Sequence, residues 1–572
     1  MSETDRDATT FRASDQPWHR NPWVGMGGIV LASVITIAIA FSGPSAAAIN
    51  PGPRHNLLPP WYLPGGWVDV NQWTASILLW SMIAIAGVAL VVALRAMKAG
   101  WRPRPWRIFG LGALLNIATS LTLPLTSADV LMYAAYGRLQ VLGIDPYQIT
   151  PAEIFRQQYD PVLRWTERPW QDTPSVYGPI ASFTQWLANI LGGESMHNIV
   201  FWLQMFGLIP LLVTCFIVVW LVRHDAQRAA RASLLTIANP LLIWALTAGA
   251  HNEALSVVFA VAGIAFMRRG RWGALLAGVG IGLAGLVKVS LVFYGIAMLW
   301  GYRREPVKAG LVILGAAIPM GVGYLLISPG SLFASLRNAG YVSSGSWASY
   351  FLHWLTVMMG NPASKVVISV ISYSAMVVLA WIFFQIIPRQ QLPAPPRGPS
   401  RAVALELSGK PDPIAVTLRT ALVLCAAWLL TSPYSLPWYD LLIWVPMGML
   451  AATRLDVLVS VRVVFLSMAY ATSRDLGWMS QVDWATQRIR DLASPAVQIG
   501  VVVAIVLWWH QEWLAKPTAE RPYPLAWLRR RALRMQARLD RERAEAEPTD
   551  TPSETSEGQR TDPTPAEAGS GR

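Results

Sequence analysis

The chain has 572 residues, of which 53% are hydrophobic and only 14% are charged. A soluble globular domain carries about 25% charged residues, so this chain lacks the polar surface needed to face water on all sides. Its net charge of +13 is better explained by basic loops on the cytoplasmic side of a membrane than by nucleic acid, and no nucleic-acid partner is expected. Contact with anionic membrane lipids is consistent with the same charge.

Repeated apolar runs near the bilayer-spanning length predict an all-α polytopic membrane protein, because a helix satisfies its own backbone polar groups in lipid. About 13–14 transmembrane helices are expected. They are placed at 23–42, 73–95, 108–125, 198–222, 232–249, 252–267, 273–287, 289–301, 308–327, 364–387, 416–432, 437–453, 457–473 and 494–511.

The basic residues provide a check on this assignment. Arginine and lysine clusters follow the second, fourth, sixth, eighth and tenth runs, and they all lie on one side if both termini are cytoplasmic. This agreement requires residues 273–301 to form two short helices that turn near Lys288, because a single long span would invert everything after it. We therefore predict the pair of short helices.

The predicted membrane domain, 23–511, lies between two cytoplasmic tails, 1–22 and 512–572. The second tail begins as a basic helix and is expected to end in a disordered segment. The largest predicted loop, 126–197, is extracytoplasmic, too polar to span a membrane, and rich in Trp and Tyr. Its first part, 130–141, is expected to form a helix lying along the membrane interface.

The strongest indication of chemistry is the segment SADVLMYAAYGR at 127–138, which is followed by GIDPY at 143–147. Asp129 comes directly after the third predicted span. An ionised carboxylate at a membrane boundary is costly unless it is paired or serves a function, so Asp129 is a candidate catalytic base. The alternative is that Ser127 or Asp129 only caps the helix that follows.

Two more polar segments are expected at the same outer face. Asp172 precedes a turn fixed by two prolines and a glycine, and it either supplies a second acid or forms the turn. His251, Asn252 and Glu253 lie in a hairpin between two spans, where they bind a sugar or cap the hairpin. Two potential metal ligands without a clear third make a weak metal site, and no metal is assigned.

A lysine and two aromatic residues complete the set. Lys288 either extends its ammonium group to the membrane surface or binds an anion such as a lipid phosphate, with Arg138 and Arg337 as further candidates. Trp438 and Tyr439 either line a lipid or sugar groove or belong to the aromatic belt of the membrane interface.

These groups together match the needs of sugar transfer from a lipid phosphate. Cations stabilise the charge that develops on the leaving phosphate, and a carboxylate accepts the proton of the attacking hydroxyl. One base suffices for an inverting displacement, unlike the paired carboxylates of most glycosidases.

A family resemblance rests on motifs spread along the chain. They are Asp129, Tyr133, Gly137, Arg138, Gly143, Pro146-Tyr147, the Tyr177-Gly178-Pro179 turn, His251-Asn252-Glu253, Lys288 and Pro437-Trp438-Tyr439. In this pattern the chain resembles the polytopic glycosyltransferases of the C superfold. Within them it looks like the actinobacterial polyprenyl-phosphomannose-dependent α-1,6-mannosyltransferases of lipomannan biosynthesis. The likeness covers about 20–511.

The resemblance implies an inverting hexosyltransferase of the plasma membrane. Its donor would be polyprenyl phosphate mannose, and its acceptor a phosphatidylinositol mannoside or lipomannan, the core of lipoarabinomannan, at the outer face. No cofactor is implied, although a divalent ion held by Asp129 with Asp172 or Glu253 stays open. Some members carry a large soluble C-terminal domain; none is evident here, so tight acceptor binding is not expected.

The resemblance also implies roles for individual residues. Asp129 would be the catalytic residue, and the donor phosphate would be held by Lys288 with Arg138 or Arg337. The sugars would be bound by Tyr133, Asp172, Tyr177, His251, Asn252, Glu253, Trp438 and Tyr439.

Three other functions remain as alternatives. A relative of the same superfold could transfer arabinose or another sugar. A lipid-linked sugar flippase or transporter would place charges near the bilayer midplane and broken helices in paired halves. The polar residues instead concentrate at the outer boundary. A non-catalytic scaffold would have no need for the clustered acids and lysine.

Overall fold

The computed structural model describes residues 11–64, 71–167, 170–334, 340–392, 412–471 and 479–515. The chain divides into two compact units, 1–509 and 510–572. In the second unit the described residues, 510–515, are the last part of a helix. The predicted C-terminal tail beyond 515 and Arg337 lie outside the described residues.

The described residues form helices and no β-strand. The α-helices are α1 (Pro22–Phe41), α2 (Gln72–Lys98), α3 (Pro105–Ser120), α4 (Asp129–Val141), α5 (Pro151–Gln157), α6 (Pro179–Gly192), α7 (Met196–Leu221), α8 (Ala226–Leu235), α9 (Pro240–Leu242), α10 (Glu253–Phe266), α11 (Gly270–Gly285), α12 (Val292–Gly301), α13 (Pro306–Gly321), α14 (Trp347–Met359), α15 (Asn361–Ile386), α17 (Pro413–Thr431), α18 (Leu441–Met449), α19 (Leu455–Tyr470), α20 (Ser480–Arg488) and α21 (Ser494–Ala515). Short 3₁₀ or π turns are η2 (Ala13–Asp15), η3 (Trp18–Arg20), η4 (Leu163–Trp165), η5 (Trp170–Asp172), η6 (Ile243–Ala248), η7 (Val289–Leu291), η8 (Val322–Ile327), η9 (Pro329–Ser331), η11 (Pro437–Asp440) and η12 (Ile489–Ala493).

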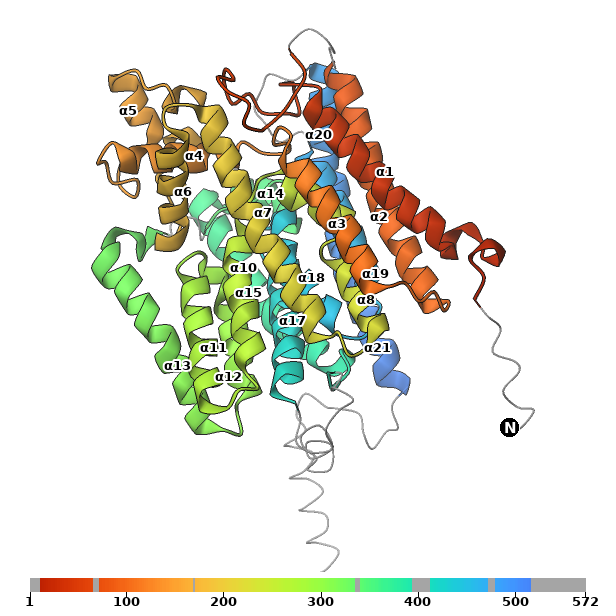
Figure 1. Ribbon diagram of the computed structural model, residues 1–572. Helices are drawn as coiled ribbons and strands as arrows, with labels where there is room; N and C mark the ends of the chain where they lie inside the picture. The colour runs from red at the N-terminus through yellow and green to blue at the C-terminus, as the bar shows by residue number, and fades with distance from the viewer. Residues whose placement is uncertain are drawn as a thin grey trace, which may run out of the picture. The chain divides into compact units, whose positions relative to one another are not determined.

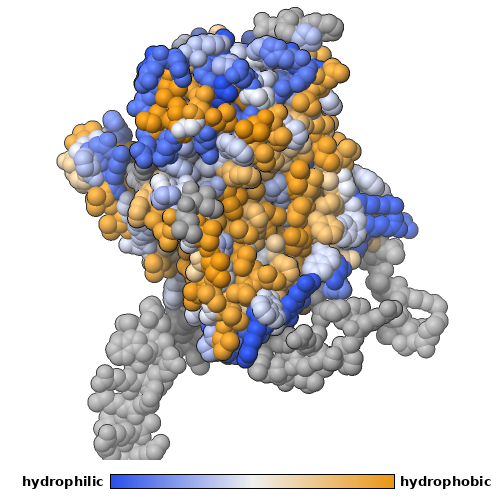
Figure 2. All heavy atoms as spheres, turned by 60° about the vertical axis from the view of Figure 1, so that its left-hand side comes forward, coloured by the Kyte–Doolittle hydropathy of each residue, from blue (hydrophilic) through white to orange (hydrophobic). Residues whose placement is uncertain are grey.

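The chain is an all-α polytopic membrane protein, as the sequence predicts. Eight helical segments in the described part are long and apolar enough to cross a membrane. The other expected spans are present as shorter helices, of which α10 and α12 are strongly apolar. One face of the molecule is largely hydrophobic along the flank of the helices, with hydrophilic residues gathered at its ends (Figure 2).

The predicted turn near Lys288 is confirmed, because α11 ends at Gly285 and α12 begins at Val292. The predicted span 232–249 is interrupted. Pro240 begins a new turn after α8, and the Asn239 side chain accepts the N–H of Leu241 at 3.0 Å. A proline has no N–H to continue a helix, which explains the break.

Helices α4, α5 and α6 lie together at one end of the molecule, and the basic loops that follow α2, α7, α10 and α12 lie at the opposite end (Figure 1). This is the segregation that the sequence predicts for the loops. Helix α4 differs from the expected surface helix, because the residues from Val130 to Leu139 are all buried. It packs against α6 and α7.

Glycine makes the contact between α4 and α6 possible. A Cβ atom on Gly137 would lie 2.1 Å from the carbonyl oxygen of Gln185 and 2.3 Å from the Asn189 side chain. The Asn189 amide donates to the Ala134 carbonyl at 2.9 Å. The middle of α4 is thereby packed against α6.

Candidate active site

A cavity of about 350 Å³ lies where the start of α4 meets the loops before α6, after α11 and after α17. The described lining contains one acidic side chain, Asp129, and one basic side chain, Lys288. Most of its other members are aromatic or carry a hydroxyl group. The predicted site residues that line it are Asp129, Tyr133, Tyr177, Lys288, Trp438 and Tyr439.

Asp129 is the first residue of α4, and its side chain is 19% exposed. Ser127 Oγ accepts the Asp129 N–H at 3.3 Å. The Asp129 carboxylate caps none of the described backbone N–H groups, and its Oδ2 lies 3.5 Å from Nδ1 of His251. The carboxylate is therefore not used as a helix cap and remains available to the cavity.

Two residues near this carboxylate adopt left-handed backbone conformations although neither is glycine. Thr126 has φ of 75° and Ala250 has φ of 51°. Such conformations cost free energy and cluster at functional sites. Between them, the Leu125 N–H donates to the Ala248 carbonyl at 2.7 Å, which joins the two turns that carry Asp129 and His251.

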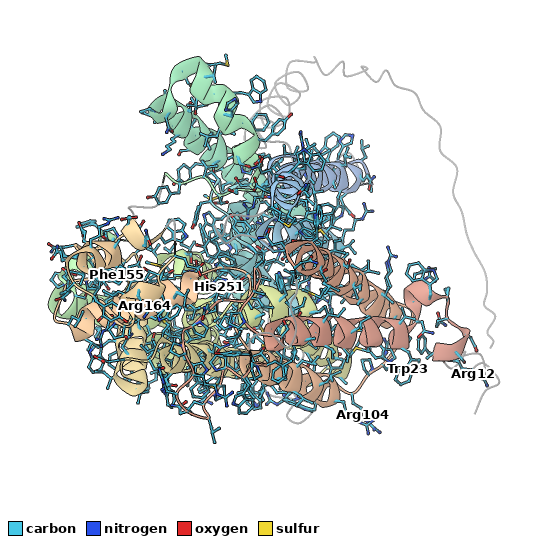
Figure 3. All side chains as sticks on the ribbon, turned by 90° about the horizontal axis from the view of Figure 1, so that it is seen from above. Arg12, Trp23, Arg104, Phe155, Arg164 and His251 are labelled. Atoms are coloured by element: carbon cyan, nitrogen blue, oxygen red, sulfur yellow. The ribbon has the colours of Figure 1, made fainter. Side chains whose placement is uncertain are left out.

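His251 belongs to the interior, in contrast to Phe155 and Arg164 at one side of the view from above (Figure 3). Its ring stacks on Trp438, with centroids 3.6 Å apart and planes 16° apart. Only Trp438 of this pair lines the cavity. The predicted contact between His251 and a sugar is thus not visible in the geometry.

Lys288 forms an ion pair with the buried carboxylate of Glu253. Its Nζ also lies 4.5 Å from the centroid of the Tyr439 ring. The ammonium group is held in the cavity wall by these two neighbours. Glu253 Oε2 and Asn252 Oδ1 are buried without a hydrogen-bond partner in the described part of the chain.

The Tyr177-Gly178-Pro179 turn lies directly against the Lys288 turn. The Gly178 N–H donates to Val287 O at 3.3 Å, and the Ile180 N–H donates to Leu286 O at 3.1 Å. A Cβ on Gly178 would lie 2.2 Å from Leu286 O, so the close approach requires glycine.

Tyr133 and Tyr177 meet edge to face, with ring centroids 5.2 Å apart. Burial raises the pKa of both hydroxyl groups well above the usual value, and the negative charge of Asp129 adds to the effect. Both tyrosines therefore stay neutral and keep a proton that can be donated to a sugar oxygen.

Five of the predicted site residues that the structure describes do not line the cavity: Arg138, Asp172, His251, Asn252 and Glu253. The buried Arg138 side chain donates to Asp160 at 2.8 Å and to Glu194 at 3.1 Å, so its charge is already neutralised. Asp172 pairs with Arg156 at 2.5 Å, with both side chains about half exposed. Neither Arg138 nor Asp172 lines the cavity, which argues against phosphate binding by the first and sugar binding by the second. Arg337, the third predicted cation, is outside the described residues.

A buried ion pair that the sequence analysis did not identify supports the 432–440 segment. Arg462 of α19 pairs with Asp440 and also donates to Ser435 Oγ at 2.5 Å and to Leu429 O at 3.1 Å. Both charged side chains are fully buried. An arginine within a predicted span is a recognisable signal, because intramembrane charges are rare and usually paired.

The described residues contain no group of three or more His, Cys, Asp or Glu side chains placed to hold a metal ion.

Comparison with known proteins gives consistent matches. The family model described as alpha-(1->6)-mannopyranosyltransferase, N-terminal domain, matches residues 28–303. Alpha-(1->6)-mannopyranosyltransferase B of Corynebacterium glutamicum is 25% identical over 387 residues, which are 61% of this chain and 62% of that protein. Alpha-(1->6)-mannopyranosyltransferase A of Mycobacterium tuberculosis is 27% identical over 300 residues, 50% and 55% of the two chains.

A probable alpha-(1->6)-mannopyranosyltransferase of Mycolicibacterium smegmatis is 32% identical over 151 residues, 26% of each chain. The chain thus spans less than two thirds of the length of each of these relatives. No solved structure matches, so the assignment to the C superfold stays a prediction.

Proposed function

We propose that the chain, which matches the alpha-(1->6)-mannopyranosyltransferase family model over residues 28–303 and is similar to proteins of that name, is an inverting mannosyltransferase of the membrane. The donor is polyprenyl phosphate mannose, and the acceptor is an α-1,6-mannan anchored to a phosphatidylinositol mannoside. The observation that carries this proposal is the cavity, whose lining combines the Asp129 carboxylate, the Lys288 ammonium group, and aromatic and hydroxyl side chains.

These groups can carry out the transfer. The acceptor hydroxyl attacks the anomeric carbon of mannose as its proton passes to Asp129, and the bond from that carbon to the phosphate oxygen breaks. The electron pair leaves with the polyprenyl phosphate, whose charge Lys288 stabilises. An ammonium group has three N–H donors, so Lys288 can hold Glu253 and a phosphate oxygen together.

The edge of the cavity suits a lipid-linked donor. Its lining includes Val289 before α12 and Tyr373 of α15, whose exposed fractions are 53% and 61%. Trp428 of α17 also lines the cavity. A polyprenyl tail at this flank would stay in lipid while its phosphate reaches Lys288.

The position of the basic loops supports an active site at the outer face. These loops lie at the end opposite to α4, and cytoplasmic loops carry the excess of Lys and Arg (Figure 1). In this orientation both termini are cytoplasmic in the plasma membrane, and the acceptor glycan grows outside.

The direct test is transfer of labelled mannose by the purified protein in detergent. The donors to compare are polyprenyl phosphomannose, polyprenyl phosphoarabinose and a nucleotide-activated mannose, each with a short α-1,6-mannoside acceptor. We expect transfer from the first donor alone, and a product sensitive to an α-mannosidase. Transfer from the arabinose donor alone would mean that the transferred sugar is arabinose and not mannose. Movement of the donor across the membrane of sealed liposomes, without a new glycosidic bond, would identify the protein as a flippase and not an enzyme.

Lys288 should act mainly on donor binding. Because loss of the lysine alone would leave Glu253 buried and unpaired, the informative protein is the double variant Lys288→Ala, Glu253→Gln. Its KM for the donor should rise about tenfold or more, since a charge-assisted hydrogen bond contributes about 1.5–3 kcal/mol. Initial rates over a range of donor concentrations measure this.

The matched control is Glu253→Gln alone, which keeps the lysine and removes only its partner. Its donor KM should change much less than that of the double variant. An unchanged donor KM in the double variant would mean that the phosphate is held elsewhere.

A further inference from the structure

The contact between His251 and Asp129 has no part in the chemistry described so far. The imidazole is 1% exposed and does not line the cavity, whereas Asp129 does. Neither ring nitrogen has a hydrogen-bond partner in the described part of the chain. His251 Nδ1 lies 3.5 Å from Asp129 Oδ2, which is slightly too long for a hydrogen bond.

The ring is fixed on two sides by groups that give it no polar contact. Trp438 covers one face, with the planes only 16° apart. Gly249 lies at the edge, where a Cβ atom would come within 2.4 Å of Cδ2 and 2.6 Å of Nε2. The backbone of Ala250, which lies between Gly249 and His251 in the chain, is in the left-handed region with φ of 51°. This strain and this close packing hold an imidazole against the carboxylate at a cost in stability.

We propose that His251 is a positioning residue for Asp129. In the neutral imidazole, Nδ1–H donates to Oδ2 and fixes the carboxylate, so that the other oxygen receives the proton of the acceptor hydroxyl. Hydrogen bonds of catalytic groups are often long before substrate binds and shorten in the reactive complex. The proton stays on Asp129, and His251 changes neither charge nor covalent state during transfer. The role rests on the proposed function.

This role differs from the sugar contact that the sequence suggested for His251. A sugar-binding residue would affect KM, whereas a group that orients the base affects kcat. The distinction can be measured because Trp438, Tyr177 and Tyr133 remain to bind sugar when His251 is changed.

The test compares two substitutions that separate the ring from its N–H group. His251→Phe keeps a ring to stack on Trp438 and removes the donor. His251→Asn gives up the stacking but places an amide N–H near the site of Nδ1. We expect kcat to fall about 100-fold in the first protein, with both KM values within about threefold of the wild type. The kcat of His251→Asn should be about tenfold higher than that of His251→Phe.

His353→Phe is the matched control, because His353 is an exposed residue of α14. It should leave kcat unchanged. Thermal unfolding in detergent is measured on all of these proteins. A further variant, Gly249→Ala, crowds the same imidazole and should lower kcat without removing any polar group.

Three results would overturn the role. The first is a kcat in His251→Phe within about threefold of the wild type. The second is a change confined to KM. The third is equal loss in the Phe and Asn proteins together with a lower unfolding temperature, which would identify a structural residue. If the wild type transfers no sugar while the donor is intact, the proposed function fails and this role fails with it; the first three results leave the proposed function standing.

Discussion

The Asp129→Asn protein should fold normally and lose about 10²–10⁴-fold in kcat for mannose transfer. Asparagine has nearly the shape of aspartate but cannot accept the acceptor proton. The fold should survive because the carboxylate caps no described backbone group and lies 3.5 Å from His251, beyond a normal hydrogen bond. Single-turnover transfer from polyprenyl phosphomannose, with thermal unfolding of the same preparation, measures both properties.

Asp172→Asn is the matched control for this experiment. Asp172 was also a candidate from the sequence, but its carboxylate pairs with Arg156 outside the cavity, where both side chains are about half exposed. An exposed ion pair contributes little, so its kcat should stay within about twofold of the wild type. If a folded Asp129→Asn protein turns over like the wild type, the base has been assigned to the wrong residue.

Arg462→Met should produce the largest loss of stability. The change leaves Asp440 buried without its cation, and breaking a buried ion pair in this way costs about 3–5 kcal/mol. The same change releases Ser435 and the Leu429 carbonyl, which Arg462 also binds, so the segment carrying Trp438 and Tyr439 loses its support. Thermal unfolding in detergent should show a clearly lower midpoint, with a matching loss of active protein.

A second variant distinguishes the unpaired charge from lost packing. Adding Asp440→Leu to Arg462→Met removes the stranded carboxylate, and a buried pair replaced by apolar residues is often tolerated, so much of the stability should return. Arg303→Met is the matched control, because that arginine is exposed and lies over Trp300. Equal unfolding midpoints for Arg462→Met and Arg303→Met would contradict a structural role for the buried pair.

The membrane architecture follows largely from local sequence properties. Apolar runs locate the helices because each span satisfies its own hydrogen bonds, and this requirement does not depend on the neighbours. The distribution of Lys and Arg correctly separated 273–301 into two helices, since charged side chains are excluded from lipid. Successive spans cross the membrane in alternating directions. The sequence therefore predicted that Asp129, the 251–253 hairpin, Lys288 and Trp438 lie at the same end of the molecule.

The sequence was less informative wherever a side chain is defined by its partner. Arg138 and Asp172 look like free charges in the sequence, but each has an opposite charge beside it in space. Residues 130–141 were expected to lie along the membrane interface, yet Val130 to Leu139 are all buried and α4 packs against α6 and α7.

The sequence by itself thus determined that the chain is a helical membrane protein with a polar site at one end, because hydrophobicity and charge act on each segment separately. Only the tertiary structure decided which of those polar groups act together. The Lys288–Glu253 pair, the His251–Trp438 stack and the Arg462–Asp440 pair each join different elements. Such contacts depend on the packing of helices distant in the chain, and no local pattern records that packing.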